Sequence, residues 1–188
     1  MYCKPYSLYT VNMTKYIAML RGAGPGNPNM HQHKLIAAVE ALGFSNVHAV
    51  ISSGNVIFES DSTDSKTLES RLEKMWPVSL GFISTTIVRS QVQLQNLIAA
   101  NPFKDIQDLP GSRLNVTFLK DQPANIVAFP HHGLRFYAVG EYDGAVCSVL
   151  DLSGGKTPGV FSWVDEQYGP ENTSRTWKTV QRILKKME

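Results

Sequence analysis

Apolar positions in the first half of the chain alternate between the spacing of strands and that of helices. A hairpin is expected around the turn residues Ser52–Asn55, and Pro77 is expected to stop the second helix. The predicted elements are, in order, a strand at 16–20, a helix at 35–42, strands at 47–51 and 56–58, a helix at 68–75 and a strand at 82–88. This order is that of a ferredoxin-like βαββαβ unit, an antiparallel sheet covered by two helices.

The second half repeats this plan after a connecting helix. Ser90 and Gln93 form a capping box, and the polar residues 104–112 resemble a linker. The predicted elements are then a strand at 114–119, a short helix after Asp121, strands at 134–139 and 145–150, a helix at 160–168, a strand at 172–175 and a helix at 177–187. The chain is therefore predicted to be an α+β protein with two tandem ferredoxin-like (βαββαβ) subdomains, each with an antiparallel sheet covered by helices.

These patterns give four segments. Residues 1–13 lack a helical or strand period and are expected to be a disordered extension, with Met13 as an alternative start. Residues 14–89 form the first subdomain, 90–112 the connecting helix and linker, and 113–188 the second subdomain.

Composition narrows the class of protein. The 188 residues are 43% hydrophobic and 18% charged, which is ordinary for a globular protein, and the net charge of +2 does not by itself indicate nucleic acid. No stretch is long and apolar enough to span a bilayer. Two distant cysteines, Cys3 and Cys147, do not form a disulfide framework and suit a reducing compartment, so a cytoplasmic location is expected.

Four short motifs lie at residues 16–22, at 41–44 leading to 53–56, at 101–103 and at 173–180. In this order they resemble the domain-of-unknown-function 1697 family, which is mainly bacterial. The resemblance implies two tandem ferredoxin-like subdomains and supplies no proven catalytic residues. The chain departs from the usual loop of the family at Ala23, Gly24, Pro25 and Asn27, and from a usual asparagine at Thr176.

Four polar residues beside turns and element ends are candidates for binding a ligand: Arg21, Asn55, Lys156 and Arg175. The glycine-rich segment after Arg21 could form an anion nest or be a surface connection. Lys156 lies in the segment Gly154–Thr157, which resembles the end of a P-loop but lacks the first glycine of that motif. The segment is therefore expected to be a loop after a strand. The resemblance to the family mildly favours a role for Lys156 in lining a groove.

Arg175 has two possible roles. Its guanidinium could hold an oxyanion, or it could brace the fold by pairing with Asp165 or Glu166. It begins a basic stripe on the last helix that could contact phosphates or simply be solvated. The stripe comprises Arg175, Lys178, Arg182 and Lys185, and Trp177 is on the opposite, apolar face, where it is expected to anchor the helix.

The sequence contains no catalytic constellation and no group with metal-ligand spacing, so no cofactor is expected and any catalytic residues remain unidentified. The leading hypothesis is a domain that binds an anionic ligand, either a nucleotide or nucleic acid. The first alternative is an enzyme acting on a small substrate in the cleft between the subdomains. The second is an interaction or dimerisation module that uses an exposed sheet edge.

Overall fold

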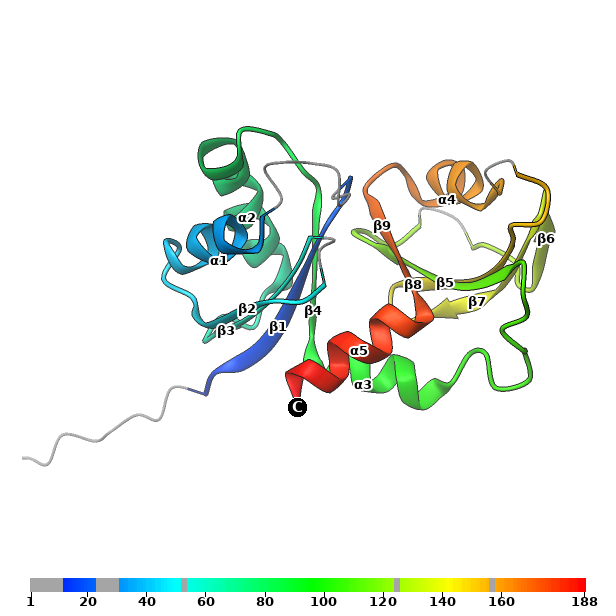
Figure 1. The fold of residues 1–188 in the computed structure, drawn as a ribbon, viewed down its shortest axis with the longest axis horizontal. Helices are drawn as coiled ribbons and strands as arrows, with labels where there is room; N and C mark the ends of the chain where they lie inside the picture. The colour runs from blue at the N-terminus through cyan, green and yellow to red at the C-terminus, as the bar shows by residue number, and fades with distance from the viewer. Residues whose placement is uncertain (1–11, 23–30, 52–53, 124–125, 156–157) are drawn as a thin grey trace, which may run out of the picture.

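The computed structural model of the protein describes residues 12–22, 31–51, 54–123, 126–155 and 158–188 (Figure 1). Within these ranges the chain forms two antiparallel sheets and five helices, so the predicted α+β class is confirmed. Residues 1–11 of the expected extension, and the candidate Lys156, lie outside the described residues.

The first sheet has the strand order β2-β3-β1-β4, and all three neighbouring pairs are antiparallel. Its elements are β1 (Thr14–Leu20), α1 (Gln32–Glu40), β2 (Ser45–Ala49), β3 (Asn55–Ser60), α2 (Ser65–Leu80) and β4 (Thr86–Ser90). The helices α1 and α2 cover one face of this sheet (Figure 1). Asp64 begins α2 as its N-cap, because its carboxylate accepts the backbone N–H groups of Lys66 and Thr67.

The second sheet has the order β6-β7-β8-β5-β9. Its strands and the remaining helices are α3 (Gln91–Ala100), β5 (Ser112–Leu119), β6 (His131–Gly133), β7 (Phe136–Tyr142), β8 (Ala145–Asp151), α4 (Val160–Tyr168), β9 (Asn172–Thr176) and α5 (Trp177–Met187). The capping box predicted at Ser90 and Gln93 begins α3. In Figure 1, α4 lies over the second sheet, whereas α3 and α5 lie between the two sheets at their lower side.

Three local predictions are wrong. The helix expected after Asp121 is absent from residues 121–123 and 126–130, and the short strand β6 follows instead. Pro77 does not stop α2, which continues to Leu80 and ends at Gly81, a glycine in the left-handed region. As a result, β4 begins at Thr86, four residues later than the predicted strand. The missing amide hydrogen of Pro77 affects a single bond in the last turn, so the helix continues.

One hydrophobic core joins the two sheets. It contains side chains from β1, β3 and β4 of the first sheet, β5 and β8 of the second, and the helices α3 and α5. The residues that α5 places in this core are Trp177, Val180, Ile183, Leu184 and Met187. Trp177 is buried as predicted and packs edge-on against Phe103, with the ring centroids 5.3 Å apart. The halves therefore share apolar contacts that neither would retain alone.

A polar seam continues this junction at the free edge of β4. Glu69 and Glu73 on α2 accept the backbone N–H groups of Val88 and Thr86, at 2.9 and 2.8 Å. Two cations, Arg89 and Lys120, extend the seam to the second half.

Arg89 and Lys120 link these carboxylates to the second sheet. Arg89 is only 8% exposed, and its Nη1 lies 4.0 Å from Oε1 of Glu69. Its Nη2 donates to the carbonyl oxygens of Leu119 and Gly144. The Nζ of Lys120 lies 2.6 Å from a carboxylate oxygen of Glu73 and 3.2 Å from a carboxylate oxygen of Glu171. The edge of β4 is therefore closed by side chains, and the same side chains hold the two halves together.

Candidate functional site

Arg175 lies at the centre of the junction, where β9 passes the ends of β1 and β3. Its guanidinium donates five hydrogen bonds to described residues. The acceptors are Asn55 Oδ1 at 2.6 Å, Thr173 Oγ1 at 2.8 Å and the carbonyl oxygens of Ser174 at 2.8 Å, Leu20 at 3.0 Å and Gly54 at 3.3 Å. The guanidinium of Arg175 thus links β9 to the end of β1 and to the start of β3.

Asn55 completes this arrangement from the other side. It is fully buried and donates through Nδ2 to the carbonyl of Val50, at 3.2 Å, while it accepts from Arg175. Loss of hydration lowers the pKa of Arg175 to about 10. The pairing of Arg175 with Asp165 or Glu166, which the bracing role predicted, does not occur among the contacts of the described residues. The geometry is nevertheless that of a brace, with neutral acceptors in place of a carboxylate.

Arg21 lies beside Arg175 on an open cleft. Its Nη2 is 3.5 Å from the carboxylate of Asp165, and its Nη1 donates to the carbonyl of Asn172 at 3.3 Å. The cleft has a volume of about 470 Å³ and is lined by Leu20, Arg21, Gly22, Phe161, Asp165, Asn172, Thr173, Ser174 and Arg175. The structure therefore brings Arg21, Asn55 and Arg175 to one region, although Asn55 lies behind Arg175 rather than on the cleft.

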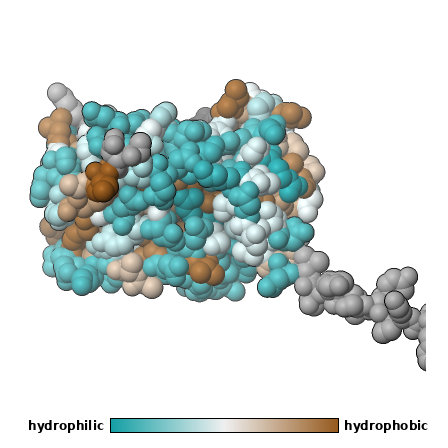
Figure 2. Space-filling view, turned by 180° about the vertical axis from the view of Figure 1, so that it is seen from behind, coloured by the Kyte–Doolittle hydropathy of each residue, from teal (hydrophilic) through white to brown (hydrophobic). Residues whose placement is uncertain are grey.

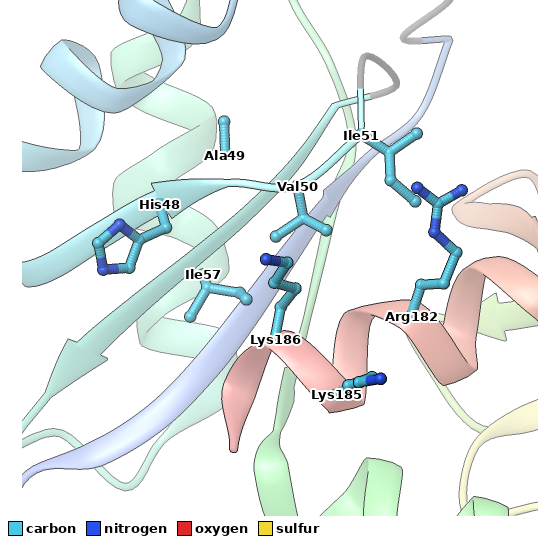
Figure 3. Close-up of a pocket in the computed structure, with 8 residues that line it drawn as sticks. All are labelled: His48, Ala49, Val50, Ile51, Ile57, Arg182, Lys185 and Lys186. Carbon is cyan, nitrogen blue, oxygen red and sulfur yellow. The ribbon is translucent and has the colours of Figure 1, made fainter.

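A larger groove separates α5 from β2. Its volume is about 870 Å³, and it is lined by His48, Ala49, Val50, Ile51, Ile57, Arg182, Lys185 and Lys186. We call it the α5–β2 groove. Figure 3 shows Lys186 extending from α5 toward Val50 and Ile57, and Arg182 extending toward Ile51. No carboxylate lies among the described residues that line it.

The amphipathic character of α5 produces this groove. The apolar face of the helix is buried in the shared core, which leaves Arg182, Lys185 and Lys186 exposed on the opposite side. The side chains of these three cations make no hydrogen bond or ion pair with another described residue. Their positive charge is therefore directed toward the groove and solvent rather than toward an internal partner.

The structure divides the basic stripe predicted on the last helix. Arg175 belongs to β9 and points into the junction, and Lys178 pairs with Asp108 at 2.6 Å. Arg182 and Lys185 remain on the α5–β2 groove, where Lys186 joins them. The sequence interpretation did not include His48, which lies opposite Ile57 in the β2–β3 register and therefore on the side of the sheet that faces α5. The only sequence signal for His48 was its alternation with Val47 in a strand.

Other chemistry is sparse in the described ranges. They contain no group of three or more His, Cys, Asp or Glu side chains that could hold a metal ion. Cys147 is buried in β8, and burial raises the pKa of its thiol to about 12, which suits a structural rather than a nucleophilic role. None of the helices described has the length and apolar character needed to cross a bilayer. Figure 2 shows a largely hydrophilic face on which the apolar groups are scattered.

Comparison with known proteins agrees with this picture. The fold is similar to one described as "The structure of conserved bacterial protein SP0830 from Streptococcus pneumoniae", with a TM-score of 0.70 over 94% of this chain and 100% of that chain. The two sequences are 17% identical, so the likeness shows the fold alone. No curated protein matches the sequence. Residues 13–130, well over half of the chain, match a family described as "Protein of unknown function (DUF1697)", and the chain belongs to that family.

Proposed function

We propose that the protein binds an anionic, phosphate-bearing ligand in the α5–β2 groove. The observation that carries this proposal is the gathering of Arg182, Lys185 and Lys186 on one groove with no carboxylate among its described lining residues. Phosphate oxygens are ligands that both Lys and Arg recognise, the first as a point charge and the second through a fork. The groove is also within the size range of pockets that hold small ligands.

A titration with pyrophosphate and with AMP tests this proposal. Isothermal calorimetry at low salt should give binding to the wild-type protein and a loss of at least tenfold in affinity for Lys185→Gln/Lys186→Gln. Lys178→Gln is the matched control, because Lys178 lies on the same helix and outside the groove. Equal affinities for wild type and the double variant would place the ligand elsewhere.

The Arg21 cleft is the second candidate, as a site for an enzyme acting on a small substrate. Asp165 is the one carboxylate among its described lining residues. Asp165 already faces Arg21, and it accepts a hydrogen bond from Asn172 Nδ2 at 2.6 Å. In this second candidate function, Arg175 and Asn55 position the strands because their hydrogen bonds are made to the protein itself. Arg21 is then the cation of this cleft that is suited to a ligand.

The proposal also includes the tandem ferredoxin-like arrangement. In the first half, β4-β1-β3-β2 are neighbours, and in the second half the corresponding strands β9-β5-β8-β7 are neighbours in the same order. Support comes from the placement of α2 and α4 before the last strand of each half. An experimental structure with a different strand order in either half would contradict the repeat.

A further inference from the structure

We propose that the occupant of the α5–β2 groove is a single-stranded nucleic acid. This inference rests on the proposed function, since it identifies the ligand of the same site. It depends on three features: the cations on one side of α5, the apolar floor beside them, and the irregular edge of β2.

The cations are distributed along one side of α5. Arg182 lies three residues from Lys185 and four from Lys186, so the arginine is a neighbour of both lysines on the helix surface. The helical rise places the lysines about 4.5 and 6 Å from Arg182 along the axis, and about 1.5 Å from each other. Charges spaced in this way can contact more than one phosphate of a chain, whereas a single phosphate would engage only part of them. The volume of about 870 Å³ also exceeds what a lone phosphate group requires.

The opposite wall of the groove is suited to bases. Ile51 is half-buried and offers apolar surface, Val50 is buried at the base of the groove, and the exposed His48 ring stands on β2 (Figure 3). Proteins that bind single strands combine a positive groove for the backbone with aromatic side chains on which bases stack, and the ring of His48 is suited to that role. A duplex hides its bases and would leave this wall without a partner.

The edge of β2 argues against an acidic peptide added as a further strand. Pairing between β2 and β3 shifts register between Ser45 and His48, and Asn46 has a φ of 49°. The side chain of Asn46 is held by Glu59, with Nδ2 2.6 Å from the carboxylate. A bulged edge offers an irregular row of backbone groups, which disfavours strand addition.

The test measures fluorescence anisotropy of labelled twelve-nucleotide single strands, one DNA and one RNA, with the full chain at 50 to 200 mM salt. With three phosphate contacts, the slope of log K against log salt should be about −2, which corresponds to a loss of roughly 20-fold over this range. For Lys185→Gln/Lys186→Gln the slope should weaken by about 1.4. His48→Ala should reduce affinity about fivefold and leave the slope unchanged.

Controls separate this inference from the proposed function. Lys178→Gln should bind like the wild type, because it removes one lysine charge of the same helix outside the groove. If AMP binds in the groove as tightly as the oligonucleotides, the proposed function holds and the single-strand inference is wrong. If an oligo-glutamate peptide of equal charge or a DNA duplex competes as well as the single strand, the inference is also overturned. If neither AMP, pyrophosphate nor any oligonucleotide binds, both proposals fail.

Discussion

Two groups of cations in this protein behave in opposite ways. Arg89, Lys120 and Arg175 are enclosed at the junction of the two sheets and donate to carbonyls, an amide oxygen and carboxylates. Arg182, Lys185 and Lys186 lie on α5 and are exposed on a groove without a carboxylate among its described lining residues. The first group stabilises the arrangement of the halves, and in the proposed function the second binds the ligand. A positive residue near a turn is therefore not by itself evidence of a binding site.

The strongest test of this comparison is Arg175→Leu. The change removes the donor for Asn55 Oδ1 and for the carbonyl of Gly54, so we expect the free energy of unfolding to fall by about 3 kcal/mol. Urea denaturation of the ligand-free protein measures this loss. Arg182→Leu is the control, and it should change stability by no more than about 0.5 kcal/mol because the residue is exposed. Equal effects of the two variants would remove the distinction between the groups.

Lys120→Met is expected to have a smaller effect, about 1–2 kcal/mol, since the apolar stem is retained and the bonds to Glu73 and Glu171 are lost. Burial lowers the pKa of Lys120, but its hydrogen bonds to the two glutamates outweigh that effect and raise it. A raised pKa means that this stabilisation is complete at neutral pH and is lost as the pH rises through the folded-state pKa, above 10.5. Urea midpoints of wild type and variant should therefore converge at strongly alkaline pH.

Glu69→Gln examines the buried carboxylate of the seam. Burial raises the pKa of Glu69 despite the hydrogen bond from Val88 and the charge of Arg89. Ionisation of Glu69 therefore opposes folding, so the stability of the wild type relative to the variant should decrease as the pH rises from about 4 toward 7. Paired urea titrations at these pH values measure the difference. A difference that is constant with pH would contradict the raised pKa.

The smallest effect is expected for Lys185→Gln/Lys186→Gln in the absence of ligand. Both side chains are exposed and are close to a third cation, so the change in stability should stay within about 0.5 kcal/mol and favour the variant at low salt. Thermal melts of the wild type and the double variant at two salt concentrations measure this difference in stability. A destabilisation above about 1 kcal/mol would indicate that these lysines support the fold, as Arg175 does.

The features that could be predicted from the sequence are those that neighbouring residues determine, such as the start of a helix or its buried face. Ser90 begins a helix as its capping box indicates, and Trp177 is buried as its place on the apolar face predicts. The helix predicted after Asp121 was wrong because an aspartate favours turns as well as helix N-caps. No local pattern could show that this connection lacks a helix.

The candidate site was harder to predict because it depends on strand register. The sequence placed Arg175 beside turns, but only the approach of β1, β3 and β9 shows that its donors are directed to protein acceptors. His48 joins the groove because it lies opposite Ile57, a register that depends on the bulge in β2. Whether Lys156 contributes, as proposed from the sequence, stays a prediction.

The position of α5 in the shared core affects the order in which the protein can fold during synthesis. Val180, Ile183 and Met187 belong to the same core as apolar side chains of β1 and β3, which the ribosome releases more than a hundred residues earlier. The core on this face of the first sheet therefore stays incomplete until the final helix emerges, and holdase chaperones bind chains that expose such apolar surface. Nascent chains arrested after residue 168 should be cleaved by protease within the first half, and release of α5 should protect them.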